Sequence, residues 1–207
     1  SNINSRQPET VISGNERVIR PRLADAAFFF ETDKKNSLSQ LRERLKSIVF
    51  QKQLGTVFDK TERIALLSEG LATALDADGA AAKLAGQLSK ADLASDMVLE
   101  FDKMQGTAGG YYAKHEGLEK QVSSAIADHY LPKFSGDKVP TSVVASSVAL
   151  ADRLDTLTGI FGIGQIPSGS KDPFALRRAS ISILQIILQN KLSINIKNWI
   201  HTACNLH

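Results

Sequence analysis

The chain has 207 residues, of which 43% are hydrophobic and 23% are charged, and its formal net charge is +3. These values exclude wholesale disorder and leave room for one sizeable core, or for one domain and part of a second. The single cysteine, Cys204, excludes an internal disulfide and a multi-cysteine metal site, and no apolar run is long enough to span a membrane. Residues 1–63 hold 12 Lys or Arg against 8 Asp or Glu, which permits nucleic-acid binding without requiring it.

Helical periodicity dominates the chain and predicts an all-α fold. Residues 1–10 are polar and unpatterned, so we expect a disordered leader at 1–14. A run rich in alanine and phenylalanine, 21–30, opens at Pro21 and predicts a packed helix. Only short stretches, such as 17–20, are compatible with a strand.

Apolar stripes at spacings near 3.6 residues predict three further helices, at 57–75, 84–101 and 144–161. Thr56, with Asp59 three residues later, has the pattern of a capping box that starts the first of them. Glycines between 159 and 164 stand where the third is expected to stop. A fourth apolar stripe, strongly apolar, predicts a helix at 174–189.

The start of that fourth helix is the most informative place in the chain. Asp172 is a suitable N-cap and Pro173 a suitable first helical residue, so the helix is expected to begin there. Arg177 and Arg178 would then lie in its second turn. Together with Lys171 and the amide end of the helix they would attract an anion such as a nucleic-acid phosphate. A solvated amphipathic helix explains the same residues equally well.

Two further motifs are weaker. The segment 164–171 looks like a phosphate-binding P-loop, but that motif requires a lysine directly after its second glycine, and here Ser170 intervenes. Tyr111 and Tyr112, near His115, are of a type that stacks on unpaired bases, yet such tyrosines more often pack into a core. No Ser-His-Asp set is proposed, because such triads are recognised by geometry.

Several longer sequence blocks occur together in one order. They are RVIRPRLADA at 17–26, FFFETD at 28–33, QLGT at 53–56, SKADL at 89–93, GIFGIG at 159–164 and KDPFALRRA at 171–179. In these blocks the chain resembles the β subunit of the bacterial tetrameric type of glycyl-tRNA synthetase, from about Gly14 to Leu192. That β subunit is several times longer, so the chain resembles an internal piece of it.

The resemblance implies an HD-phosphohydrolase-like helical domain at 15–161 with a degenerate metal site. In that superfamily a histidine, a His-Asp pair and a later aspartate bind metal. Here Lys60 stands at the first position, Lys90 and Ala91 at the pair (or the pair begins one residue earlier), and Asp152 at the last. A lysine ammonium is a cation and does not ligate a divalent metal, so we expect neither a bound metal nor phosphatase activity.

What remains at these positions is a charged pocket. We expect it to hold Lys60 and Lys90 beside Asp92 and Asp152, whereas the four histidines do not fall at the ligand positions. The pocket is either a cationic site that faces phosphate or a structural salt-bridge group. We favour the structural group, because buried charges are usually paired.

The resemblance also implies how the rest of the chain is organised. A glycine-rich linker, 162–171, is the best domain boundary, and 172–207 would begin a truncated anticodon-binding domain. Its apolar helix is expected to pack on the main body or to meet further sequence. In this family a separate α subunit activates glycine with ATP and Mg²⁺, so no catalytic residue and no bound cofactor are expected here.

The expected function is a non-catalytic module for tRNA recognition and assembly within a glycine–tRNA ligase. Its expected partners are glycine tRNA and the α subunit, in the cytoplasm, with no membrane and no DNA. Two alternatives stay open at this stage. One is a metal-dependent phosphohydrolase of HD type, and the other is a pure scaffold for α–β assembly.

Overall fold

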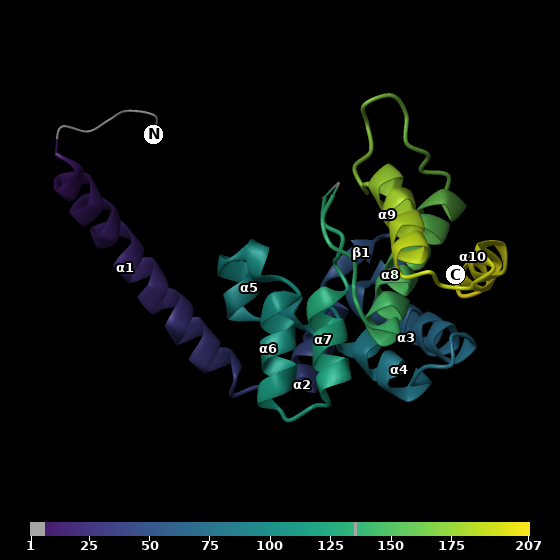
Figure 1. Cartoon of the computed structure of the whole chain (residues 1–207), viewed down its shortest axis with the longest axis horizontal. Coiled ribbons are helices and arrows are strands. Elements are labelled where there is room, and N and C mark those ends of the chain that lie inside the picture. Colours follow the sequence, from purple (N-terminus) through teal and green to yellow (C-terminus); the bar gives the residue numbers. More distant parts are fainter. Residues whose placement is uncertain (1–6, 135) are drawn as a thin grey trace.

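A computed structural model describes residues 7–134 and 136–207, and helices dominate it (Figure 1). The α-helices are α1 (Pro8–Asp33), α2 (Leu38–Arg44), α3 (Val57–Ala74), α4 (Gly79–Leu88), α5 (Asp96–Glu100), α6 (Thr107–His115), α7 (Lys120–Asp128), α8 (Val143–Gly162), α9 (Leu176–Gln189) and α10 (Ile196–Cys204). Short 3₁₀ helices are η1 (Leu45–Ser47), η2 (Ala91–Ala94) and η3 (Asp102–Met104). The predicted all-α class is confirmed. Within the described ranges, no helix is long and apolar enough to cross a membrane.

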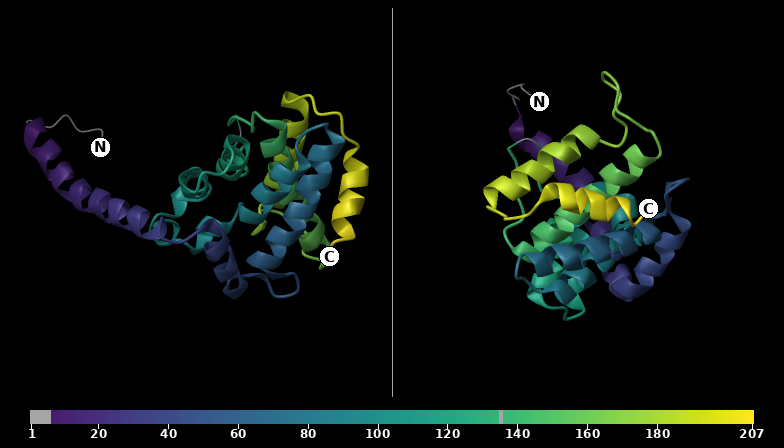
Figure 2. Two further views of the ribbon diagram at one scale, coloured as in Figure 1. Left: turned by 90° about the horizontal axis from the view of Figure 1, so that it is seen from below. Right: turned by 90° about the vertical axis from the view of Figure 1, so that its right-hand side faces the viewer.

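Helix α1 extends away from the rest of the molecule (Figures 1 and 2). Residues 8–14 belong to this helix, so the predicted leader is wrong for them, while 1–6 lie outside the described residues. Residues 17–20 are helical and not a strand, because the turns on either side continue the helix through them. Pro21 lies inside the helix and does not open it; Pro8 stands at its start.

The C-terminal end of α1 is anchored to the body by a buried carboxylate. Asp33 accepts hydrogen bonds from the backbone amides of Asp96 and Met97, both at 2.9 Å, which caps the start of α5. The Tyr112 hydroxyl donates to the same carboxylate at 2.8 Å, and Tyr112 is buried. Tyr112 is therefore a core residue, as the more common interpretation of the tyrosine pair predicts, whereas Tyr111 is exposed.

The main core lies where α3, α4, α7 and α8 pack on one another. Helix α3 begins with the predicted capping box: the Thr56 hydroxyl accepts from the Asp59 amide at 3.2 Å, and the Asp59 carboxylate accepts from the Thr56 amide at 2.8 Å. The small antiparallel sheet, β1 (Val49–Gln51) with β2 (Gly55–Thr56), leads into this helix start. The stripes at 57–75 and 144–161 thus supply two walls of the core.

The predicted helix at 84–101 is instead three short elements, α4, η2 and α5. The chain leaves the helical path at Lys90, and the Ser95 hydroxyl accepts a hydrogen bond from the Val98 amide at 3.2 Å, so a new helix starts there. The apolar spacing in the sequence runs across this break, because each of the short elements buries its apolar side chains in the same core.

Helices α9 and α10 pack back on the body. Ile183 and Ile186 of α9 join the core cluster, and both α9 and α10 pack on α8. The Trp199 ring of α10 lies so close to Gly70 of α3 that a Cβ there would stand 2.9 Å from its Cη2 atom. The stretch after the linker therefore shares the core of the preceding helices.

Close packing of α3 on α4 gives a test of the fold. A Cβ added at Gly86 would lie 2.9 Å from the Cα atom of Ala65, a backbone atom that cannot turn aside. Gly86→Ala is expected to lower the free energy of unfolding by about 1–3 kcal/mol, because the two helices must separate. Gly14→Ala is the matched control: this helical position has nothing within 4 Å, and the change is expected to stabilise by roughly 0.5–1 kcal/mol. Urea unfolding measures both, and equal effects of the two substitutions would contradict the packing.

Candidate functional site

A cluster of buried charges lies between α3, the end of α4 and α8. The Lys60 ammonium is 3.0 Å from Oδ1 of Asp152, and the Lys90 ammonium is 2.6 Å from Oδ2. The side chains are 6%, 6% and 13% exposed for Lys60, Lys90 and Asp152. One carboxylate therefore bridges two ammonium groups, and the three positions singled out in the sequence do converge. Ala91, the fourth position, is buried in the hydrophobic core instead.

A second carboxylate supports the Lys60 side of the cluster. The Lys60 ammonium donates to Asp155 at 2.8 Å and to the Thr156 hydroxyl at 2.7 Å. The other oxygen of Asp155 is 2.5 Å from the Arg63 guanidinium. Arg63 and Asp155 were not among the site residues predicted from the sequence, although a signal existed. Each follows a residue of the cluster by three positions, which puts it on the same face of its helix.

His129 supports the Lys90 side. Its Nδ1 atom lies 2.7 Å from the carbonyl oxygen of Ile126, so this nitrogen carries the proton and donates. The other nitrogen, Nε2, then has a free lone pair and accepts from the Lys90 ammonium at 2.9 Å. The histidines were not predicted to belong to the site, because none stands at a ligand position. The fold brings His129 into the cluster from the end of α7.

The two lysines differ in their electrostatic surroundings. Burial lowers the pKa of Lys60, but the attraction of the carboxylates of Asp155 and Asp152 outweighs it, and the net direction is a raised pKa. Lys90 faces only one of these carboxylates, that of Asp152, and its attraction does not outweigh burial. Burial, together with the repulsion from Lys60, lowers the pKa of Lys90 to about 8. Burial also lowers the pKa of His129 well below its ordinary value, and the charge of Lys90 adds to that effect.

The carboxylate of Asp152 stays ionised in this setting. Burial alone raises the pKa of Asp152, but the positive charges of Lys90 and Lys60 hold it well below its ordinary value. A divalent metal here would meet two ammonium groups that already take up both carboxylate oxygens, so this donor set does not fit a metal. Across the parts of the chain that the structure describes, no group of three or more His, Cys, Asp or Glu side chains is placed to hold one.

Asp92 does not join the lysines, contrary to the prediction. One of its oxygens accepts hydrogen bonds from the backbone amides of Gly106 at 2.6 Å and Gly109 at 3.0 Å, at the start of α6. The other oxygen is buried without a partner among the described residues. Burial raises the pKa of Asp92 even though the two amides lower it. Asp92 therefore holds the start of α6. It does not reach the lysines because the chain enters η2 directly after Lys90 and turns away from them.

The start of α9 also differs from the prediction. The helix begins at Leu176, and Ala175 before it has φ 53°, so the start lies three residues later than expected. The Asp172 carboxylate still caps the helix, but from across the turn: it accepts from the amides of Leu176 at 2.8 Å and Arg177 at 3.0 Å. Arg177 and Arg178 consequently lie in the first turn, and both are exposed. Asp172 occupies helix amides that would otherwise face an anion.

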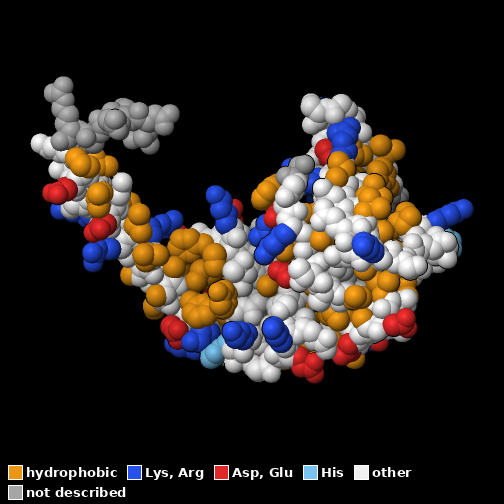
Figure 3. Space-filling model, viewed as in Figure 1, with side chains coloured by type: hydrophobic (Ala, Val, Ile, Leu, Met, Phe, Trp, Pro, Cys, Tyr) orange, Lys and Arg blue, Asp and Glu red, His pale blue; other side chains and the backbone are white. Residues whose placement is uncertain are grey.

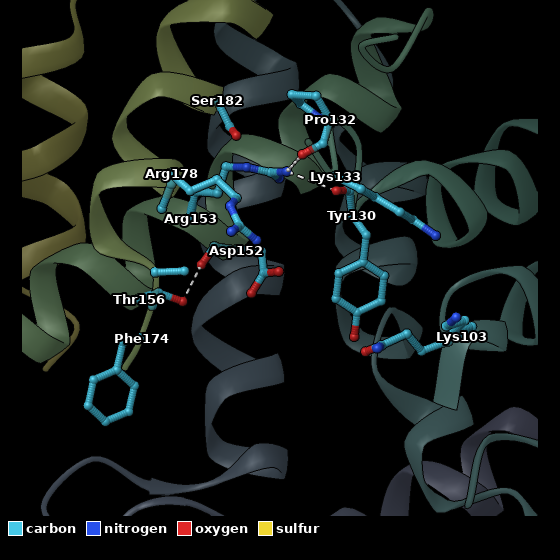
Figure 4. Close-up of a pocket in the computed structure, with 13 residues that line it drawn as sticks. Lys103, Tyr130, Pro132, Lys133, Asp152, Arg153, Thr156, Phe174, Arg178 and Ser182 are labelled. Carbon is cyan, nitrogen blue, oxygen red and sulfur yellow. Dashed lines mark hydrogen bonds between the residues drawn. The ribbon is translucent and has the colours of Figure 1, made fainter. Parts of the chain in front are cut away.

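A groove of about 650 Å³ joins the cluster to the start of α9 (Figure 4). Figure 4 shows Arg178 and Asp152 on one wall and Tyr130, Lys133 and Lys103 on the other. The groove is lined by Lys103, Gln105, Tyr130, Pro132, Lys133, Asp152, Arg153, Thr156, Phe174, Ala175, Arg178, Ala179 and Ser182. Arg178 and Asp152, from two separately predicted sites, therefore share one cavity. Arg177 and Lys171 do not line it, and Lys171 borders a smaller cavity of about 250 Å³ beside the linker.

The bridging role of Asp152 predicts a large loss of stability on its removal. Asp152→Asn is expected to lower the free energy of unfolding by about 3 kcal/mol, because the buried ammonium of Lys90 loses its carboxylate partner and that of Lys60 loses one of its two. The isosteric change Asp102→Asn, at an exposed position, is the control and is expected to stay within about 0.5 kcal/mol. Both are measured by urea denaturation. A loss below 1 kcal/mol for Asp152→Asn would show that the cluster does not depend on this carboxylate.

The neutral state of His129 predicts a pH dependence of stability. Its pKa in the folded protein lies well below the unfolded value of about 6.5, so the unfolded chain binds the extra proton first. The contribution is fully present above about pH 6.5 and is lost as the pH falls, by at most about 1.4 kcal/mol per pH unit. Thermal unfolding between pH 7 and pH 5 should show this slope, and His129→Gln should reduce it. His115→Gln, at an exposed histidine, should leave the slope unchanged.

Comparison with known proteins gives the family of the chain. The family described as glycyl-tRNA synthetase beta subunit matches residues 1–207. The chain is 56% identical over 203 residues to the glycine–tRNA ligase beta subunit of Psychromonas ingrahamii, covering 98% of this chain and 30% of that relative. It is 52% identical over 207 residues to that of Chromohalobacter salexigens, covering 100% of this chain and 30% of that relative. The chain thus spans 30% of the length of these curated relatives. By the whole-length family match and these identities, the chain belongs to the glycyl-tRNA synthetase β subunit family.

Proposed function

We propose that the chain is a non-catalytic module for tRNA recognition and assembly in a glycine–tRNA ligase. The relatives are named beta subunits of that ligase, a name that implies a further subunit and a tRNA substrate. In this proposal the α subunit activates glycine with ATP and Mg²⁺, and the present chain, in the cytoplasm, helps to bind glycine tRNA. In this role the chain contributes affinity for the tRNA and positions it, and takes no part in the chemical steps.

The observation that carries the proposal is the exposed pair Arg177 and Arg178 on the first turn of α9. A helix holds these guanidiniums in place, and its apolar side, with Ile183 and Ile186, is fixed in the core. Lys171 lies near the same end, on the linker. Because Asp172 caps the helix amides, a phosphate here would be bound by the guanidiniums and the ammonium, and not by the helix end.

The charged cluster of Lys60, Lys90 and Asp152 has a structural role in this proposal. Its lysines stand where an HD-type enzyme has metal ligands, and both neutralise the carboxylate that such a metal would need. We therefore assign no metal of its own to this chain and no phosphohydrolase activity. The cluster instead connects α3, the end of α4 and α8, and α9 packs on the last of these helices.

The arginine pair gives the test of the proposal. Arg177→Ala with Arg178→Ala is expected to weaken RNA binding nearly equally for all RNA sequences, glycine tRNA included, and to lower the salt slope by about one unit per lost phosphate contact. Filter binding or fluorescence anisotropy at several salt concentrations measures both affinity and slope. The control, Lys52→Ala with Lys197→Ala, removes the same charge from exposed positions elsewhere and is expected to leave the slope unchanged.

Two outcomes would contradict this role of α9. Unaltered affinity and slope in the double variant would exclude contact with phosphate. A lower melting temperature with an unaltered slope in the protein that still folds would assign the arginines a structural role.

A further inference from the structure

The groove of Figure 4 is formed by parts of the chain that are far apart in the sequence. Its walls come from η3 and Gln105 after it, the segment after α7, the middle of α8, and the start of α9 with the two residues before it. Its volume of about 650 Å³ lies within the range typical of sites for small molecules, roughly 300–1,000 Å³. The volume of the groove thus suits a ligand of the size of a mononucleotide.

The lining of the groove carries an excess of positive charge. It includes four basic side chains and one acidic side chain, Asp152, whose charge is already matched by Lys60 and Lys90. Three of the basic residues, Lys103, Lys133 and Arg178, have no ion-pair partner in the described ranges. A concave surface lined by one sign of charge concentrates the field and attracts ligands of the opposite sign.

Hydroxyl groups in the groove provide directional hydrogen-bond donors in addition to the basic side chains. Ser182 is 3% exposed and lines the groove, and no protein group described in the structure hydrogen-bonds its hydroxyl. The Tyr130 hydroxyl likewise lacks a protein partner there. Phe174 adds an apolar ring to the lining, against which a nucleobase can stack. The groove therefore combines cations, neutral donors and an aromatic surface.

We infer that this groove binds a nucleoside phosphate monoester, with the phosphate on the wall that carries Lys103 and Lys133 and with Arg178 on the facing wall. A phosphate monoester carries close to two negative charges at neutral pH and presents three acceptor oxygens, which matches the two ammonium groups of Lys103 and Lys133 on one wall of the groove. A carboxylate has one charge and two oxygens and would leave part of this set unpaired. The groove shares Arg178 with the proposed tRNA surface, whereas Arg177 and Lys171 lie outside it.

The first experiment titrates the 207-residue chain with AMP and with adenosine by isothermal calorimetry. AMP is expected to bind at one site per chain and adenosine at least tenfold more weakly, because the phosphate supplies most of the attraction. Inorganic phosphate should compete with AMP at constant ionic strength. Equal binding of adenosine and AMP, or no competition by inorganic phosphate, would overturn the inference.

Substitutions locate the site. Lys103→Ala with Lys133→Ala is expected to weaken AMP at least tenfold, while Lys52→Ala with Lys197→Ala, the control of equal charge, leaves the affinity unchanged. Equal weakening by both pairs would show non-specific attraction and overturn the inference. Dichroism spectra confirm folding, and the single variants Lys103→Gln and Lys133→Gln replace the pair if it does not fold. Neither pair includes Arg177 or Arg178. If AMP does not bind as expected, the tRNA proposal is therefore unaffected, and if the arginine pair does not contact tRNA, the inference about AMP is unaffected.

The same phosphate chemistry occurs at the end of an RNA strand as well as on a free nucleotide. Short RNA hexamers with and without a 5′-phosphate distinguish these sources. A phosphorylated hexamer that binds at least tenfold more tightly than AMP, and more tightly than its unphosphorylated form, assigns the site to an RNA end. Binding no tighter than that of AMP assigns it to the free nucleotide.

Discussion

The carboxylate of Asp152 is the interaction on which the centre of the molecule depends. It lies between two ammonium groups that come from α3 and from the end of α4, and it is itself carried by α8. Removing ions from water is costly, so the two lysines can be buried only where a counter-charge meets them. The relative positions of the three helices are therefore specified by charge as well as by apolar packing, and a shift of one helical turn would separate the pairs.

Around this neutralised centre lies a second set of charges that is not neutralised. Lys103, Lys133 and Arg178 reach the groove from three different segments, and only the packing of α9 on α8 brings the last of them near Asp152. Charges satisfied within the protein maintain the fold, whereas charges left to the solvent are available to a ligand. The difference between the two sets follows from the partners of each residue and not from residue type, since lysine and arginine occur in both.

Sequence patterns predicted what depends on local chemistry. The Thr56–Asp59 capping box and the stripes of α3 and α8 follow from periodicity, and Lys60, Lys90 and Asp152 were found through the resemblance. Contacts made by the fold were not predictable in this way. His129 reaches Lys90 across 39 positions of sequence, and Asp172 caps α9 from outside because Ala175 adopts a left-handed conformation that alanine rarely takes. No local pattern encodes either event.

Helix α1 is attached to the body near its C-terminal end, where Asp33 bonds to α5 and to Tyr112. Toward its N-terminal end, hydrophobic side chains such as Val18 and Ile19 remain exposed. Figure 3 shows hydrophobic side chains at the surface along this helix. A helix without tertiary contacts relies on its intrinsic propensity, which in water is marginal over a few turns. Protection of backbone amides against hydrogen exchange therefore declines along α1 from Asp33 toward Pro8, so that one continuous helix spans a wide range of local opening free energies.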